Sequence, residues 1–199
     1  MADITLEGPM VSSAVAVRMQ ALTGERLIAE ARAYSQDAWG QIYDMHYVQI
    51  YRYCYLRLGN RALSEDLASE VFLEALRGIR KYEYRGLPFR AWLFRIAHNL
   101  LADHARRNAR QHTVPLDDSH ADRLETPDST EGAALREDVR EALRQLPEAQ
   151  KQVILLRFFQ DLPHDEIAAI MGKRSGAVRA LQHRALNGLH RLMTSQRRS

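Results

Sequence analysis

The sequence predicts an all-α fold made of two small helical domains joined by an acidic, flexible linker. Apolar residues recur at spacings of three and four in most segments, and no segment reads as a strand. Residues 112–133 interrupt this periodicity with a polar, acidic stretch that contains two prolines. We therefore expect one domain at 22–111 and a second at 134–199. Residues 1–21 match no pattern, and a disordered extension, a regulatory arm and a misassigned start all remain open.

The first domain is expected to begin with helical stretches in residues 27–38 and 43–58, the second of them with a wide apolar and aromatic stripe. The pair Gly59-Asn60 is a stop signal, since glycine readily enters the left-handed region that closes a helix. Ser64 is placed to cap the helix that follows. The inward residues of that helix are Leu67, Val71, Leu73, Leu76 and Ile79.

A further helix is expected from about residue 88 to residue 110, with a proline near its first turn. Aromatic and basic residues are interleaved around its start, a composition that suits single-stranded nucleic acid because bases stack on rings and cations follow the backbone. Phe89 and Trp92 are assigned to the core. Tyr82, Tyr84 and the loop 85–88 are better candidates for capturing an unstacked base.

The second domain is expected to hold helices at 135–146 and 147–160. The inward residues of the second of these are Val153, Leu156 and Phe159. A short helix at 163–171, a turn at 172–174 and a long helix from residue 175 then form a helix-turn-helix pattern. Gly172 is expected to take the left-handed conformation at the end of the short helix, and Ser175 to cap the long one.

The helix-turn-helix predicts DNA binding, because its second helix can enter the major groove. Arg179 is placed to contact guanine, whereas Lys173 and Arg184 are placed to contact phosphates. The net charge of +3 conceals two basic blocks, +6 over residues 74–112 and +7 over residues 172–199, with −5 over residues 113–133 between them. Two separated basic blocks indicate two contacts with a polyanion, and two solvated helical faces are the alternative.

Several function classes are disfavoured by composition. The single cysteine, Cys54, excludes a disulfide scaffold and a zinc site with several thiolates. No apolar run reaches the length of a membrane span, and no secretory signal is recognisable, so we expect a cytoplasmic protein without membrane insertion. Catalytic motifs such as HExxH are absent from the sequence, and Cys54 lies within an apolar stripe, so we expect no enzyme, no metal and no cofactor.

Three stretches resemble parts of bacterial sigma factors. Asn60–Leu76 resembles their core-polymerase-binding helix, and Phe89–Arg107 resembles the segment that melts the promoter and reads the minus-ten element. Leu146–Arg157 and Glu166–Leu186 resemble their minus-thirty-five helix-turn-helix domain. Domain sizes and linker are similar to those of the extracytoplasmic-function (ECF, group 4) sigma factors of the sigma-70 family. Residues 22–111 would then be sigma region 2 and residues 134–199 sigma region 4.

The resemblance implies roles for individual residues. The residues that would bind core polymerase are Asp66, Glu70, Phe72 and Leu73. Those that would contact the minus-ten element or the adjacent upstream duplex are Lys81, Tyr82, Arg85, Arg90, Arg95, Asn99, Arg106 and Arg107. Those that would contact the minus-thirty-five element are Arg174, Ser175, Arg179, His183 and Arg184. Two departures from the family pattern are Ser69, where glutamine is common, and the lack of hydroxyl residues in 176–181.

The resemblance also implies a function and partners. The chain would be a transcription initiation factor that binds core RNA polymerase and directs it to promoter DNA. An anti-sigma factor is expected as a further partner, since exposed apolar and basic faces need covering when polymerase is absent. A dimeric helix-turn-helix regulator that acts without polymerase is the alternative, but it leaves the 60–76 helix and the first basic block unexplained.

Overall fold

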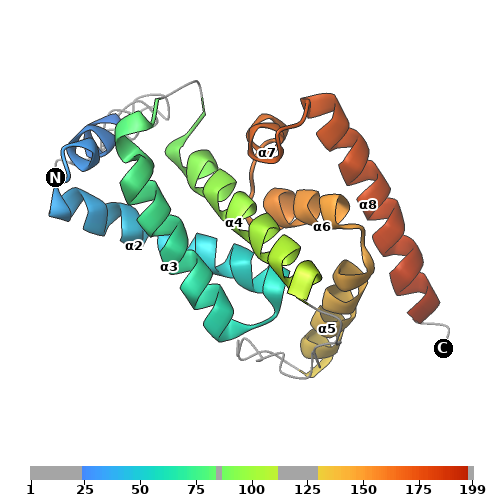
Figure 1. The fold of residues 1–199 in the computed structure, drawn as a ribbon. Coiled ribbons are helices and arrows are strands. Elements are labelled where there is room, and N and C mark those ends of the chain that lie inside the picture. Colours follow the sequence, from blue (N-terminus) through green and yellow to red (C-terminus); the bar gives the residue numbers. More distant parts are fainter. Residues whose placement is uncertain (1–23, 84–86, 112–129, 197–199) are drawn as a thin grey trace, which may run out of the picture. The chain divides into compact units, whose positions relative to one another are not determined.

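The computed structural model describes residues 24–83, 87–111 and 130–196 (Figure 1). Every regular element in these ranges is a helix, which confirms the all-α prediction. The chain divides into two compact units, residues 1–45 and residues 46–199, and each is described here by itself. The second unit contains helices from both predicted domains. The extension 1–21 and most of the predicted linker lie outside the described residues.

In the first unit, residues 24–32 form a helix, and a turn leads into α2 (Gln36–Leu58). Ser35 helps to start α2, because its hydroxyl oxygen accepts the N–H of Ala38 at 3.3 Å. The indole N–H of Trp39 donates to the carbonyl of Ala31 at 3.1 Å and so ties the two helices together. Ala31 and Ala38 are fully buried here.

The boundary between α2 and α3 (Arg61–Gly78) follows the predicted stop signal. Gly59 takes φ +67°, and its N–H donates to the carbonyl of Tyr55 at 2.8 Å. The predicted cap at Ser64 is wrong, because Asn60 caps α3 by accepting the N–H of Leu63 at 2.9 Å. Ser64 lies one turn inside the helix, and its buried hydroxyl donates to the carbonyl of Asn60 at 2.6 Å.

A short turn, η1 (Ile79–Lys81), follows α3, and α4 (Phe89–Gln111) then matches the predicted helix to within one residue at each end. Helices α3 and α4 pack on one another through apolar side chains. The buried ones are Leu67, Val71, Phe72, Ala75, Leu93, Phe94, Ala97 and Leu101. Phe94 also packs edge-on against Tyr53 of α2, with the ring centroids 5.4 Å apart. This core holds the outer face of α4 in place.

The next helices are α5 (Thr130–Gln145), α6 (Glu148–Ile154) and η2 (Leu155–Phe159), the last a single π-helical turn. The prediction that Phe159 points inward is wrong, since its side chain is 47% exposed. A π turn inserts one extra residue per turn and rotates the residues after it. Leu162 is fully buried instead, and its N–H donates to the carbonyl of Leu156 at 3.0 Å.

The helix-turn-helix consists of α7 (His164–Met171) and α8 (Ser175–Gln196), which lie side by side in Figure 1. Gly172 takes φ +61° as predicted, and the N–H of Lys173 reaches back to the carbonyl of Ala168 at 2.8 Å. Ser175 is already the first residue of α8, so the prediction that it caps the helix is off by one position. Its hydroxyl donates to the Asp165 carboxylate and joins the two helices of the motif.

Candidate nucleic-acid and polymerase interface

The outer face of α3 brings together three of the four residues expected to bind polymerase. At about 100° per residue, Asp66, Glu70 and Leu73 fall within about 60° of one another around the helix. Asp66 is exposed and Glu70 is half-buried. Leu73 leaves 51% of its surface in solvent, so the prediction that it points inward is wrong. Phe72 lies on another side, is 7% exposed, and places its ring 6.3 Å from that of Tyr47. Phe72 therefore packs in the core and does not belong to the outer face of α3.

The start of α4 carries a cluster of three aromatic rings. The ring centroids of Tyr82, Phe89 and Trp92 lie 5.0–5.2 Å apart in every pairing, and all three residues are half-buried. Tyr82, chosen as a base-capturing ring, thus shares a cluster with the two rings assigned to the core. Lys81 is exposed directly before it. Tyr84 and Arg85 lie outside the described residues.

The solvent-facing side of α4 presents Arg95, Asn99 and Arg106, which fall within about 40° of one another around the helix. All three are exposed, and Arg106 pairs with Asp103 one turn earlier. Arg107 is exposed on a different side. The structure therefore gathers three of the residues expected to contact the minus-ten element into one polar stripe.

Arg90 lies on another side of α4 and forms an ion pair with Glu166 of α7. Its Nε and Nη2 donate to the two carboxylate oxygens of Glu166, each at 3.1 Å. The Glu166 side chain is only 8% exposed, whereas that of Arg90 is 39% exposed. A two-pronged pair of this kind is the strongest geometry available to arginine and a carboxylate. It joins two helices whose paired residues are 76 positions apart.

A second set of polar contacts joins α2 and α4 to α6. The side-chain amide of Gln152 donates to the Tyr53 hydroxyl oxygen at 3.2 Å and also contacts Nδ1 of His98. Arg57 donates to the same Tyr53 oxygen at 3.2 Å, and its Nη2 lies 2.6 Å from a carboxylate oxygen of Glu148.

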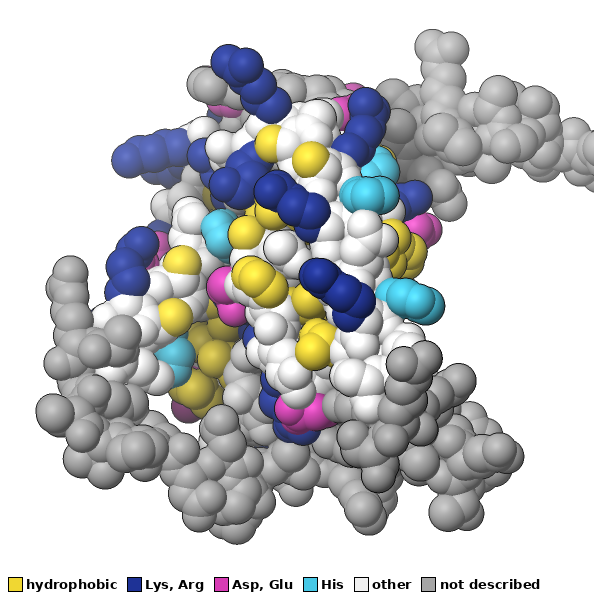
Figure 2. Space-filling model, turned by 90° about the vertical axis from the view of Figure 1, so that its right-hand side faces the viewer, with side chains coloured by type: hydrophobic (Ala, Val, Ile, Leu, Met, Phe, Trp, Pro, Cys, Tyr) yellow, Lys and Arg dark blue, Asp and Glu magenta, His cyan; other side chains and the backbone are white. Residues whose placement is uncertain are grey.

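The exposed side of α8 and the turn before it is basic. Ser175, Arg179 and His183 recur every four residues and share one face, on which Arg179 and His183 are exposed and Ser175 is half-buried. Lys173 and Arg174 are exposed in the turn, and Arg184 is exposed on a neighbouring side of the helix. Figure 2 shows this side of the molecule, with Lys and Arg side chains spread along it and only isolated acidic ones. The predicted minus-thirty-five residues thus surround the first turns of the second helix.

Comparison with known proteins identifies the family of this chain. The family models Sigma-70 region 2 and Sigma-70 region 4 match residues 42–111 and 136–188. The chain is 39% identical over 175 residues to the ECF RNA polymerase sigma factor BldN of Streptomyces coelicolor, with 86% of this chain and 66% of that protein covered. It is 34% identical over 179 residues to the ECF RNA polymerase sigma factor SigD of Mycobacterium bovis, with 84% of each covered. The chain belongs to the ECF sigma factors.

A solved structure shares the fold of this sigma factor. The sigma factor RpoE in complex with the anti-sigma factor NepR, from Bartonella quintana, aligns with a TM-score of 0.65 at 21% identity and covers 80% of this chain and 98% of that one. The resemblance to sigma factors noted in the sequence is therefore confirmed for the family and the fold. Promoter-directed initiation of transcription, which that resemblance implied, is confirmed at the level of the family.

The contacts that sequence reasoning missed in this sigma factor are the ones between its two matched regions. Tyr53, Arg57 and His98 belong to region 2, whereas Gln152 and Glu148 belong to region 4. Burial lowers the pKa of His98, and the neighbouring Arg57 cation lowers it further. In the sequence these residues are visible only as polar positions within helices of apolar periodicity. That pattern does not indicate which residue each one contacts.

Other groups in the sigma factor with possible chemistry are enclosed or dispersed. Burial raises the pKa of the Cys54 thiol to about 12, so this sulfur is neutral and enclosed, in line with its interpretation as a core residue. Within the described residues, histidine, cysteine and carboxylate side chains do not gather into a group able to hold a metal ion. None of the described helices is both long and apolar enough to cross a membrane.

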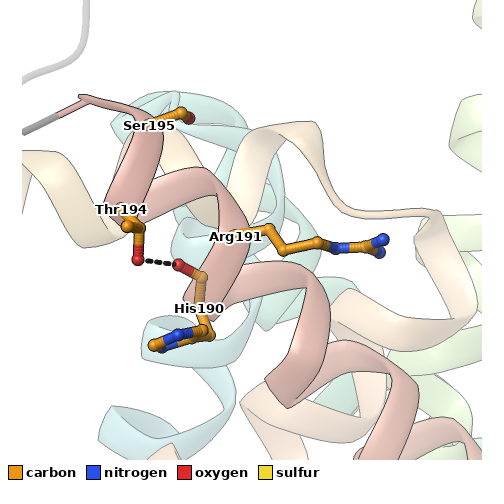
Figure 3. A pocket seen from close by; sticks show the side chains of 4 residues that line it. All are labelled: His190, Arg191, Thr194 and Ser195. Carbon is orange, nitrogen blue, oxygen red and sulfur yellow. Dashed lines mark hydrogen bonds between the residues drawn. The ribbon is translucent and has the colours of Figure 1, made fainter. Parts of the chain in front are cut away.

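A shallow hollow lies at the end of α8 of this sigma factor, lined by His190, Arg191, Thr194 and Ser195 (Figure 3). All four residues come from the last turns of one helix, and the Thr194 hydroxyl donates to the backbone carbonyl of His190 at 2.7 Å. None of the predicted DNA or polymerase contacts lies in it. The hollow is a feature of one helix surface and is remote in sequence from the recognition turn.

Proposed function

We propose that this sigma factor binds core RNA polymerase through the outer face of α3 and positions it on promoters through α4 and α8. Residues 22–111 act as region 2 and residues 134–199 as region 4, with 112–133 as the linker between them. The observation that carries this proposal is the exposed basic face at the start of α8. The second helix of a helix-turn-helix reads DNA with its first residues, and here these are Ser175, Arg179 and His183 on one face of α8.

The minus-thirty-five element is contacted in this proposal by Ser175, Arg179 and His183 from the shared face of α8, with Arg174 and Arg184 on flanking phosphates. Arg179 is the residue best placed for a base, because it lies on the exposed face one turn into the helix and can form two hydrogen bonds to guanine. Replacing Arg179 by alanine should cost about 1–3 kcal/mol of discrimination at one base pair.

Promoters are first mapped by sequencing transcript starts after overexpression of the sigma factor. The experiment is then multi-round transcription in vitro from these promoters with purified core polymerase. Arg179→Ala should lower transcription from the parent promoter and lose the difference between the parent and one altered minus-thirty-five base pair. Arg191→Ala is the matched control, because this arginine is exposed on the same helix but three turns further along. Unchanged base-pair selectivity in Arg179→Ala contradicts the assignment, and tight promoter binding by the free chain without polymerase would support the dimeric-regulator alternative.

The minus-ten element is contacted in this proposal by the α4 stripe of Arg95, Asn99 and Arg106. Support comes from the exposure of all three on one face, as an arrangement that follows a strand backbone requires. Lys81, Tyr82 and Arg85 flank a flipped base, and Arg90 and Arg107 provide further phosphate contacts. The rings of Phe89 and Trp92 pack against that of Tyr82 and hold it in place beside the base.

Core polymerase docks in this proposal on Asp66, Glu70 and Leu73. Leu73→Ala is the test, since this leucine is 51% exposed and its removal should leave stability within about 0.5 kcal/mol. Phe72→Ala is the contrasting variant, because this ring is buried and its loss should cost about 3 kcal/mol. Pull-down with core polymerase should show weaker capture for folded Leu73→Ala, and capture equal to the parent would contradict this docking face.

An anti-sigma factor is the remaining proposed partner, and the protein acts in the cytoplasm without catalysis of its own. Support comes from exposed aromatic side chains in region 4, Phe158 at 54% and Phe159 at 47%, and from the partner named for the structural relative. Capture of the tagged chain from a native lysate, followed by mass spectrometry, tests this. Recovery of polymerase subunits alone contradicts the anti-sigma proposal.

A further inference from the structure

Ala180, in the second turn of α8, is exposed on the side of the helix that faces DNA in the proposed function. At about 100° per residue, it lies within about 60° of both His183 and Arg184 around the helix. It lies about 160° from Val178, whose side chain is fully buried. The methyl group of Ala180 therefore points away from the core of the helix-turn-helix, between two residues expected to contact the minus-thirty-five element.

The neighbouring side chains leave this methyl group uncovered. The His183 ring contacts the side-chain amide of Asn187, one turn further along the helix, at 3.4 Å. Nε of Arg184 donates to the backbone carbonyl of Ala180 at 3.3 Å, so the guanidinium lies beside the backbone of this turn. Figure 2 shows hydrophobic side chains in small patches between Lys and Arg side chains on this side of the molecule. Ala180 is thus an open apolar position with a cation held next to it.

Polar groups that could contact a base are scarce in this part of α8. Arg179 has the only polar side chain in residues 176–181, and its two hydrogen bonds can address one guanine. Any further base edge that faces these turns meets an apolar side chain. Two alanines are exposed there, Ala177 and Ala180. Ala180 is the nearer to the DNA-facing side, because it lies about 60° from His183 around the helix, whereas Ala177 lies about 120° from it.

An alanine methyl group can distinguish one base from the others in the major groove. The apolar group that this groove offers is the C5 methyl of thymine, and the other groups at the base edges are hydrogen-bond donors and acceptors. A methyl group packed against a donor or acceptor displaces water without replacing its hydrogen bond, which is unfavourable. Packed against the thymine methyl, it removes apolar surface from water, which is favourable. Ala180 therefore fits thymine.

We propose that Ala180 contacts the C5 methyl group of a thymine in the minus-thirty-five element and so sets the base preference at that position. The thymine belongs to a base pair other than the one that Arg179 contacts. This inference rests on the proposed function, in which the first turns of α8 lie in the major groove. Arg184 supports the placement, because its guanidinium lies beside Ala180 and carries further N–H groups that can bind a phosphate close to the same base.

The test replaces single thymines by deoxyuridine, which keeps the base pair and the O4 acceptor and lacks only the C5 methyl group. Each thymine of either strand of the minus-thirty-five element is replaced in turn. The promoter fragments are transcribed by limiting holoenzyme, formed from the full chain and core polymerase. At one thymine, transcription should fall about fourfold, as expected for the loss of one buried methyl group. Equal transcription at every position overturns the inference, as does a minus-thirty-five element without thymine.

Ala180→Gly removes the methyl group from the protein and not from the DNA. This variant should transcribe the thymine and deoxyuridine templates equally at the sensitive position. Ala62→Gly is the matched control, with the same change at an exposed position of α3, and it should keep the ratio of the parent. The ratio of two templates for one protein cancels a loss of folded protein, and circular dichroism checks that the helices remain. A parental ratio that persists in Ala180→Gly overturns the assignment to Ala180.

A cytosine at the sensitive position provides the reverse test. Transcription by the parent should fall with cytosine and should rise about fourfold again when that cytosine carries a C5 methyl group. Ala180→Gly should show no such rise. If the methyl group on cytosine has no effect on the parent, the effect of deoxyuridine comes from the DNA itself, and the contact with Ala180 is refuted.

The variant Arg179→Ala separates this inference from the proposed function. If Arg179→Ala loses base-pair selectivity while the parent transcribes thymine and deoxyuridine templates equally, α8 reads the minus-thirty-five element and the inference on Ala180 is refuted. If no base-pair change in this element alters transcription by the parent, the proposed function fails, and the inference fails with it.

Discussion

Two glycines of the helix-turn-helix should respond in opposite directions to the same substitution. Gly172 ends α7 with φ +61° and ψ +36°, whereas Gly176 lies in the first turn of α8 and shows no positive φ. A Cβ added at either position would meet no atom within 4 Å. Steric crowding by neighbours is therefore absent from both, and only the conformational preference of the backbone differs.

The size of the difference follows from that preference. Alanine in the left-handed region costs about 1–2 kcal/mol. Alanine also lowers the conformational entropy of the unfolded chain, which offsets part of this cost, so Gly172→Ala should destabilise the protein by about 1 kcal/mol. Alanine in a helix is favoured over glycine, so Gly176→Ala should stabilise by about 0.5 kcal/mol. For a chain of this length, 1 kcal/mol corresponds to about 2–4 °C in Tm.

Thermal unfolding followed by circular dichroism measures both variants. The Tm of Gly172→Ala should lie below that of the parent and the Tm of Gly176→Ala slightly above it. Gly172→Asn serves as a control, because asparagine tolerates the left-handed region better than alanine and should recover part of the loss. A Tm of Gly172→Ala equal to or above that of Gly176→Ala would refute the reasoning from backbone conformation. Reduced use of the minus-thirty-five element by stable Gly176→Ala would show that DNA needs a close approach to this backbone.

Three further changes test the packing. Gly188→Ala would place a Cβ 2.9 Å from Leu146 Cδ2 and should lower the free energy of unfolding in urea by about 1 kcal/mol. The loss should be smaller in a Leu146→Ala background, and equal losses in both backgrounds would contradict the contact. Cys54, with its pKa raised to about 12, should react with a disulfide reagent at pH 8 only as fast as the chain unfolds, and rapid labelling of folded protein would be inconsistent with its burial. Tyr53→Phe should cost about 1 kcal/mol in unfolding free energy, because Gln152 and Arg57 lose a shared acceptor, and unchanged stability would show that the hydroxyl contributes nothing.

The elements that could be predicted are those governed by local physics. The period of the apolar residues located α4 to within one residue at each end, and the need for a left-handed residue located Gly172. Local chemistry did not decide between two possible caps of α3, Asn60 and Ser64. In the structure Asn60 is the cap, because its side-chain oxygen accepts the N–H of Leu63. The π turn at 155–159 escaped prediction because a sequence period assumes a constant helix pitch.

The candidate site divides in the same way. Faces that depend on helix periodicity alone, such as Asp66 with Leu73 or Arg95 with Asn99, follow from the spacing of the residues. Contacts across the fold do not, and the two ends of the hydrogen bond between Tyr53 and Gln152 are 99 positions apart. The burial of Tyr53 likewise depends on Phe94 and Gln152, which lie on other helices, and its own helix does not reveal it.

The composition of the contact between the regions bears on how the sigma factor works. A permanent interface is best built from apolar side chains, because their burial is favourable and needs no matched partner. Here enclosed positions are occupied by a tyrosine hydroxyl, an amide and a carboxylate, each satisfied by a partner across the contact. Such groups fix one arrangement yet lose little when water replaces the partner. The contact between region 2 and region 4 therefore specifies their arrangement through direction, as the two hydrogen bonds from Arg90 to Glu166 do, and adds little net stability to it.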